Sequence, residues 1–242
     1  VEDLEEVIIT TTNGRPAAFI AESIMGVAGY VVPPAGYFQK AAEVIHHYGG
    51  LLIIDEVQAG FGRTGKHWFG IEHWGVEPDI MVMAKGIANG APVGATITTD
   101  EIAHAWKGKT LSTFGGTPVS MAALCATQDV LQEESAPANA FARGEELRAG
   151  MIDIQERHPW VGDVRGMGLM QAMEIVKDPE TKEPDTERTA ALLAATRDEG
   201  LLVGQGGLNG TVIRIGPSLL ITADEIAEGI EKLGRACDKV GS

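Results

Sequence analysis

In the first part of the chain, short apolar runs alternate with a segment of helical period. The runs are AAFIAES at 17–23, LLIID at 51–55, DIMVMA at 79–84 and GATITT at 94–99. Runs this short and this rich in Ile, Val and Met are typical of strands buried on both faces of a parallel sheet. A helical stretch from Pro34 to Tyr48 lies between the first two runs and ends at Gly49-Gly50. This strand–helix–strand order predicts a βαβ unit and therefore a parallel sheet.

The second part of the chain has a different texture, with long charged helical stretches and fewer strands. Helices are predicted over 118–134, 136–158 and 187–199, and strands over 167–176, 201–207 and 211–216. A last helix is expected to begin at Thr222, because Thr222 followed by Glu225 forms a capping-box pattern. We place a domain boundary near residue 135. The prediction is a larger α/β domain over 1–135 and a smaller α+β domain over 136–242.

Composition and charge exclude several classes of protein. The chain is 44% hydrophobic and 22% charged, as a globular protein is, and no apolar run approaches the ~18 residues that a membrane-spanning helix needs. Its 34 acidic and 19 basic residues leave a net charge of −15, which argues against a nucleic-acid partner. Two cysteines are too few for a disulfide scaffold, the six histidines form no ligand pattern, and we expect no metal site. A reducing compartment, the cytoplasm, is the expectation.

Two charged residues stand where buried strands are expected to end. LLIID ends at Asp55, and DIMVMA is followed directly by Lys85. In open parallel sheets, ligands bind beyond the carboxyl ends of the strands. A lysine there can form a Schiff base with pyridoxal phosphate, and an aspartate can keep the pyridine nitrogen protonated. Taken alone, the pair also fits a structural ion pair or a helix cap, and the two residues by themselves leave both interpretations open.

The surrounding sequence resembles the class III aminotransferases that depend on pyridoxal phosphate. The resemblance is carried by residues 51–99, from LLIIDEVQAGFGRTG to MAKGIANGAPVGATITT, and by AAFIAESIMGVAGYVVPPAGYF upstream. It continues downstream through STFGGTPVSMAA, RGMGLMQAMEI and EGLLVGQGGLNGTVIRIGPSLLIT, and so covers nearly the whole chain. The resemblance implies fold type I of the pyridoxal-phosphate-dependent transferases: a mostly parallel sheet in a large domain, here partial, followed by a smaller α+β domain.

The resemblance also implies a role for each matching residue. Lys85 would form the Schiff base with pyridoxal phosphate and move the proton of the transamination, and Asp55 would pair with the pyridinium nitrogen. Val57 would pack on one face of the ring, and Gln58 would reach the phenolic oxygen. Thr113 would hydrogen-bond the cofactor phosphate, in this family usually the phosphate in the other subunit of a homodimer.

Substrate recognition is implied at a further position. Arg214 in VIRIGPS matches the arginine that binds the substrate carboxylate, a task suited to bidentate hydrogen bonds from a guanidinium. Ornithine and 4-aminobutyrate aminotransferases carry a glutamate where this chain has Val27, and valine cannot pair with the arginine. The resemblance therefore favours the alanine–glyoxylate or ω-amino acid–pyruvate branch. The expected reaction moves an amino group from an amino acid to a small 2-oxo acid, pyruvate or glyoxylate.

The length of the chain departs from the family pattern. Members are usually much longer, and the part that is not matched lies before Val1, so we expect this chain to be the C-terminal half of an enzyme. The phosphate-binding loop and any targeting segment would then lie outside it. Two alternatives stay open: another reaction within the same family, by an aminomutase or a decarboxylase, and a catalytically incomplete fragment.

Overall fold

The computed structural model describes residues 1–241, and these form two compact units. The second unit consists of residues Ile24–Val32, Gly62–Lys66 and 135 onward, and the first consists of the remaining segments, Val1–Ser23, Pro33–Phe61 and His67–Glu134. The chain thus passes into the second unit three times. The sequence pattern gave no sign of the two short segments, Ile24–Val32 and Gly62–Lys66, that belong to the second unit.

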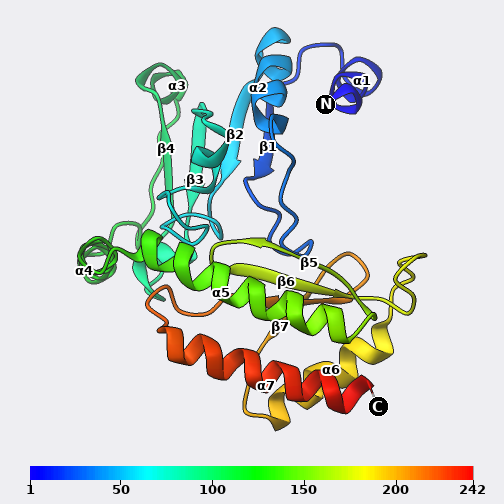
Figure 1. Cartoon of the computed structure of the whole chain (residues 1–242). Coiled ribbons are helices and arrows are strands. Elements are labelled where there is room, and N and C mark those ends of the chain that lie inside the picture. Colours follow the sequence, from blue (N-terminus) through cyan, green and yellow to red (C-terminus); the bar gives the residue numbers. More distant parts are fainter. Residues whose placement is uncertain (242) are drawn as a thin grey trace. The chain divides into compact units, whose positions relative to one another are not determined.

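The first unit is built on a four-stranded mixed sheet in the order β1-β2-β3-β4 (Figure 1). The strands are β1 (Ala18–Glu22), β2 (Leu51–Asp55), β3 (Ile80–Met83) and β4 (Ala95–Thr98). The first three run parallel, as the βαβ pattern predicts, but β4 pairs antiparallel with β3. The expectation that all four runs are parallel is therefore wrong for the last one. The reason is the short connection from β3 to β4, which holds only a 3-10 turn, whereas a parallel pair needs a longer crossover.

The helices of this unit follow the apolar spacing of the sequence. They are α1 (Glu2–Thr11), α2 (Tyr37–His47), α3 (Asp100–Ala105) and α4 (Pro118–Glu133), with 3-10 turns η1 (Gly70–Trp74) and η2 (Lys85–Ala88). In α2 the residues Phe38, Ala41 and Ile45 share one buried face, and α2 packs on β2. The ring of Phe38 meets that of Trp74 edge to face with centroids 5.1 Å apart, which brings η1 into the same core.

The second unit contains a four-stranded antiparallel sheet in the order β5-β6-β8-β7. Its strands are β5 (Val161–Met167), β6 (Met170–Ile175), β7 (Gly204–Gly206) and β8 (Val212–Ile215). The strand predicted over 167–176 is present as β6, but its start is wrong, because the chain turns at Gly168 and Met167 belongs to the preceding strand of a hairpin. Gly168 has φ +51°, a conformation that L-residues rarely adopt. The sequence analysis missed β5, whose two glycines and two charged residues weaken the period of a strand.

Three helices cover one face of this sheet: α5 (Ala136–Arg157), α6 (Thr186–Asp198) and α7 (Ala223–Gly241). Figure 1 shows α5 and α7 lying side by side along it. The capping box predicted at the start of α7 is confirmed, since Thr222 N–H donates to Glu225 Oε2 at 2.8 Å and Thr222 Oγ1 accepts from Glu225 N–H at 3.3 Å. The buried core between helices and sheet includes Leu147, Met151, Ile154, Met173, Leu192, Ile213, Ile226 and Leu233. Within residues 1–241, none of the helices combines the length and apolarity needed to cross a bilayer.

Candidate functional site

Asp55 and Lys85 lie at the carboxyl ends of two neighbouring parallel strands. Asp55 is the last residue of β2 and pairs in register with Val82 of β3. Lys85 is separated from β3 by Ala84 alone and is the first residue of η2. Asp55 is half-buried and its Oδ1 accepts a hydrogen bond from Val57 N–H at 2.9 Å, whereas Lys85 is exposed. The topology therefore brings the predicted carboxylate and amine to the same edge of the sheet, where open α/β sheets bind ligands.

The turn η2, which begins with Lys85, packs against α4. Ile87 O accepts a hydrogen bond from Gln128 Nε2 at 2.8 Å, and both Ile87 and Ala88 are buried. Lys85 itself has φ +47°, the left-handed region, which is uncommon for a residue with a side chain. Such a conformation persists only where the surroundings fix the backbone, and these cases cluster at functional sites. Sequence reasoning found Lys85 but not Gln128, since nothing in the pattern of α4 marks that contact.

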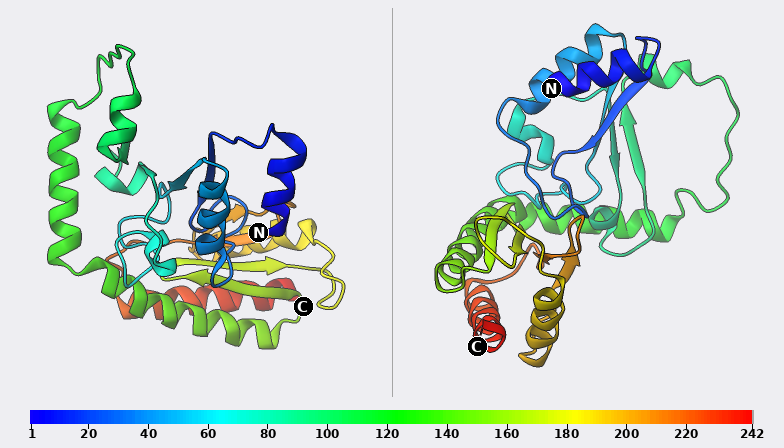
Figure 2. Two further views of the ribbon diagram at one scale, coloured as in Figure 1. Left: turned by 90° about the horizontal axis from the view of Figure 1, so that it is seen from above. Right: turned by 90° about the vertical axis from the view of Figure 1, so that its right-hand side faces the viewer.

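The other sequence-predicted cofactor residues fall into two places within the first unit. Val57 and Gln58 follow Asp55 in the turn after β2 and are half-buried. Thr113 lies instead in the exposed segment 106–117, which joins α3 to α4. The right-hand view of Figure 2 shows this segment arching away from the strands. The structure thus groups Asp55, Val57, Gln58 and Lys85 at one sheet edge and sets Thr113 apart.

A buried carboxylate next to Asp55 was missed by the sequence analysis. Glu56 is fully buried, and its two oxygens accept hydrogen bonds from Gly70 N–H at 2.9 Å and Ile71 N–H at 2.8 Å. Burial raises the pKa of Glu56 above its usual value, while these N–H groups and Ser23 act in the opposite direction. The carboxylate ties the first turn of η1 to the end of β2. The available signal was a second acidic residue directly after a buried apolar strand.

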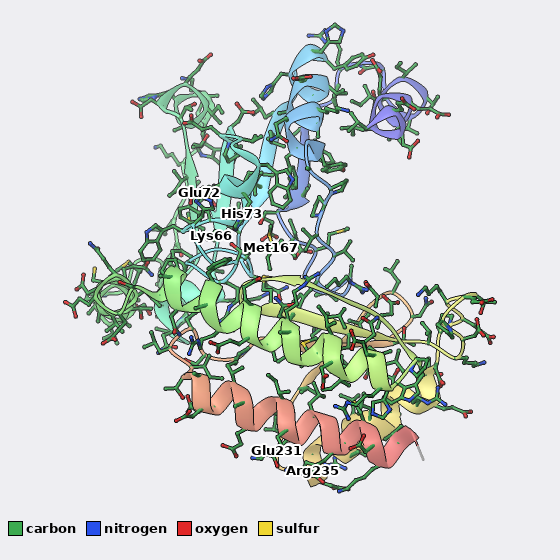
Figure 3. All side chains as sticks on the ribbon, viewed as in Figure 1. Lys66, Glu72, His73, Met167, Glu231 and Arg235 are labelled. Carbon is green, nitrogen blue, oxygen red and sulfur yellow. The ribbon has the colours of Figure 1, made fainter. Side chains whose placement is uncertain are left out.

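The turn η1 is fixed at its start by a second carboxylate. Figure 3 labels Glu72 and His73, which lie on this turn, and Glu72 Oε1 accepts a hydrogen bond from Phe69 N–H at 2.8 Å. Unlike Glu56, Glu72 is exposed. Together the two carboxylates accept from the N–H groups of three successive residues at the start of the turn, groups that a short helix leaves without internal partners.

Arg214 belongs to the second unit, on β8. Its Nη1 donates to Gly26 O at 3.2 Å, while Nε and Nη2 donate to Gln205 O at 3.2 and 2.9 Å. The side chain is half-buried. Both acceptors are backbone carbonyls, which orient the guanidinium without neutralising it.

The residues at the edge of the first sheet fit the chemistry of pyridoxal phosphate. A carboxylate matches a protonated pyridine nitrogen, a primary amine matches an aldehyde, and a side-chain amide can donate to a phenolic oxygen. Asp55, Lys85 and Gln58 supply these three groups within one strand edge and the turns that leave it. The donor set is therefore compatible with this cofactor.

Comparison with known proteins gives a family match over almost the whole chain. The model of the family described as Aminotransferase class-III matches residues 1–237.

Individual relatives and solved structures agree with that match. The chain is 41% identical over 240 residues to the alanine–glyoxylate aminotransferase 2 homolog 2 of Arabidopsis thaliana, covering 99% of this chain and 50% of that protein. It is 40% identical over 220 residues to an alanine/serine racemase of Pyrococcus horikoshii, covering 91% and 46%. An amine transaminase from an uncultivated Pseudomonas species, solved in its PLP-bound form, superposes with a TM-score of 0.92 at 36% identity, covering 99% and 56%. The chain therefore spans about half the length of the relatives it matches.

Proposed function

The chain belongs to the class III aminotransferase family, and from this premise we propose that the whole protein containing it is a pyridoxal-phosphate-dependent aminotransferase. It would move an amino group from an amino acid to a small 2-oxo acid such as pyruvate or glyoxylate. The observation that carries the proposal is the placement of Asp55 and Lys85 at one edge of a parallel sheet. The Arabidopsis relative, named for alanine and glyoxylate, supports the choice of small substrates.

Two residues of the first unit would perform the proton chemistry. Pyridoxal phosphate, the cofactor of this family, supplies an electron sink that stabilises negative charge at the substrate Cα. The Asp55 carboxylate would hold a proton at the pyridine nitrogen. The Lys85 amine, exposed at the start of η2, would bind the aldehyde carbon until the substrate amine displaces it. The freed amine would then take the proton from the substrate Cα and deliver it to the cofactor carbon.

The remaining residues would bind and orient. Val57 would pack on the ring and Gln58 would donate to its phenolic oxygen, both from the turn after β2. Thr113 would bind the phosphate held in the other subunit of a homodimer. Its exposure, in the segment between α3 and α4, would allow this contact. Arg214 would bind the substrate carboxylate. We also propose a cytoplasmic location for the protein.

A second candidate keeps the cofactor and changes the reaction. The racemase of Pyrococcus horikoshii is nearly as similar to this chain as the aminotransferase homolog is, at 40% against 41% identity. Racemisation needs the same electron sink and the same lysine but no 2-oxo acid acceptor. Aminomutase and decarboxylase activities differ in the same way, by amino migration or release of carbon dioxide without an acceptor. A catalytically incomplete fragment would show none of these activities.

The test uses the whole protein that contains this chain, with L-alanine as donor and glyoxylate as acceptor. We expect pyruvate and glycine to form, and Lys85→Ala to lower the rate at least about a hundredfold, because general acid–base catalysis contributes that much or more. Lys40→Ala, which removes an exposed lysine from α2, is the matched control and should keep the wild-type rate. After borohydride reduction, peptide mass mapping should place a pyridoxyl group on Lys85.

Three results would contradict the proposal. Wild-type turnover by Lys85→Ala would remove the lysine from the mechanism. A pyridoxyl label scattered over surface lysines would remove the assigned site. Conversion of L-alanine to D-alanine without any need for glyoxylate would favour the racemase alternative.

A further inference from the structure

The loop 24–32 lies on the sheet face of the second unit opposite its helices. Side chains alternate along β8, so that Ile213 enters the core while Val212 and Arg214 point to the other face. Three contacts hold the loop there: Arg165 Nε donates to Gly29 O at 2.8 Å, Gly207 N–H donates to Val27 O at 2.9 Å, and Arg214 donates to Gly26 O. The position of this loop is thus fixed by strands far away in the sequence.

The guanidinium of Arg214 uses three of its five N–H groups in hydrogen bonds to backbone carbonyls. Nε and one N–H of Nη2 donate to the same carbonyl, Gln205 O, and one N–H of Nη1 donates to Gly26 O. A second N–H remains on each terminal nitrogen. That remainder is what a carboxylate takes when it binds an arginine through two parallel hydrogen bonds.

The ring of Tyr30 covers the guanidinium. The Arg214 Cζ lies 5.6 Å from the ring centroid, within the range of a cation–π interaction. The hydroxyl end of the ring reaches Gly216, where an added Cβ would lie 3.2 Å from Tyr30 Oη, so the ring follows β8 past Arg214. Tyr30 has φ +56°, a conformation unfavourable for a residue with a side chain, and its N–H bonds back to Gly26 O at 3.4 Å. The tight turn that places this ring also presents the carbonyl that Arg214 binds.

Gly206 permits the close approach of Arg214 from another direction. A Cβ on Gly206 would lie 2.6 Å from Arg214 Nε and 2.7 Å from its Cδ. Only glycine leaves room for the guanidinium in its observed position. Within residues 1–241, no carboxylate lies within 4.0 Å of the guanidinium, so its charge is not cancelled by an ion pair.

We propose that Tyr30 is a positioning residue that fixes Arg214 in one orientation, with one N–H on each terminal nitrogen presented to a single carboxylate of the substrate. The inference rests on the proposed function and deepens it: Tyr30 and the carbonyls of Gly26 and Gln205 pre-orient the cation, and Gly206 makes room for it. A pre-oriented cation binds an anion with less loss of side-chain entropy than a mobile one. The protein then discriminates between an amino acid and an amine of the same shape without the carboxylate.

The experiment compares Tyr30→Leu with Tyr30→Phe in the whole protein. The first readout is the Kd of propionate, a carboxylate with no amino group, measured by ligand-observed NMR without any need for turnover. The second is the ratio of kcat/KM for L-alanine to that for isopropylamine, in which a methyl group replaces the carboxylate. We expect Tyr30→Leu to raise the propionate Kd and lower the ratio by roughly 3- to 10-fold, the strength of an exposed to partly desolvated cation–π contact. Tyr30→Phe keeps the ring and should restore both values.

Gly206→Ala is a second, independent variant, because its methyl group would push the guanidinium away from its observed position. It should raise the propionate Kd as Tyr30→Leu does. Folded Tyr30→Leu and Gly206→Ala proteins with a wild-type Kd and a wild-type ratio would overturn the inference. So would a Tyr30→Phe protein as impaired as Tyr30→Leu, since the hydroxyl and not the ring would then be responsible. Failure of the proposed function would appear differently, as a wild-type protein that binds propionate but does not transfer the amino group of alanine.

Discussion

The buried carboxylate of Glu56 provides the sharpest test of how the end of β2 is built. Its two oxygens accept from Gly70 N–H and Ile71 N–H at 2.9 and 2.8 Å, in a place that water does not reach. In Glu56→Ala both N–H groups lose their acceptor and stay buried. In Glu56→Gln one acceptor oxygen remains, and the amide NH₂ faces the other N–H group.

The magnitude follows from these two hydrogen bonds. A buried donor left without a partner costs about 1–3 kcal/mol. The Ala variant loses two acceptors but is also relieved of a buried charge, so we expect a net loss of about 2–4 kcal/mol in the free energy of unfolding. The Gln variant keeps one acceptor and should lose about 1–2 kcal/mol.

The pH dependence has a definite sign. Burial raises the pKa of Glu56 in the folded protein above the value of 4.5 that it has when exposed. The folded state therefore holds the proton more tightly, and the stability that Glu56 contributes is fully present below the unfolded pKa and is lost as pH rises through the folded pKa. Because glutamine does not titrate, the advantage of the wild type over Glu56→Gln should shrink as the pH rises from the unfolded pKa through the raised pKa of the folded protein.

The assay is urea unfolding followed by tryptophan fluorescence, since Trp74 lies on the turn that Glu56 holds. A loss of 2–4 kcal/mol corresponds to a midpoint shift of about 1 M. Glu77→Gln, the same substitution at an exposed position of the same unit, is the control and should change the unfolding free energy by less than about 0.5 kcal/mol. A Glu56→Ala midpoint equal to that of the wild type, or an advantage over Glu56→Gln that grows with pH, would refute the reasoning.

Two further predictions concern the packing of two helical glycines in the second unit and the reactivity of the two cysteines, one in each unit. A Cβ on Gly144 of α5 would lie 2.2 Å from Gly168 O, so Gly144→Ala should lower the free energy of unfolding by about 2–3 kcal/mol or more. At Gly229 of α7 nothing lies within 4 Å of an added Cβ, so Gly229→Ala should raise the free energy of unfolding by up to about 1 kcal/mol. Thermal unfolding of the two variants checks this, and equal shifts would contradict it. Burial, with a smaller effect of the neighbouring Asp238, raises the pKa of the Cys237 thiol to about 12, while Cys125 is exposed. A disulfide reagent at about pH 8 should therefore modify Cys125 in the folded protein and Cys237 only in urea, as peptide mapping would show.

Local patterns predicted those elements whose signals lie within a few residues. The capping box at Thr222 and Glu225 fixes the start of α7, because both partners of each hydrogen bond are near neighbours in the chain. The buried face of α2 and the order of strand, helix and strand were predictable for the same reason. The antiparallel β4 was not, because the direction of a strand depends on the path of its connection and not on its own pattern.

The candidate site shows the same division. The sequence indicated Asp55 and Lys85, since a charge at the end of an apolar strand is a local signal, and their common edge followed from the parallel order of β2 and β3. Glu56 could not be assigned, because its role depends on Gly70 and Ile71, which lie 14 and 15 residues further along the chain. The roles of Val57, Gln58 and Thr113 stay predictions.

The sequence by itself determined which chemical groups this protein carries, the family it belongs to and the strand ends where an acid and a lysine stand. Only the tertiary structure decided what each of those groups meets. Arg214 and its acceptor Gly26 lie 188 residues apart, and the hydrogen bond between them exists because the loop 24–32 packs on the sheet of the second unit, to which both residues belong. Contacts of this kind arise from burial and close packing of many segments at once, and no local period or motif encodes them. The sequence motif therefore identifies Arg214. Its orientation depends on contacts with Tyr30, Gly206 and two backbone carbonyls.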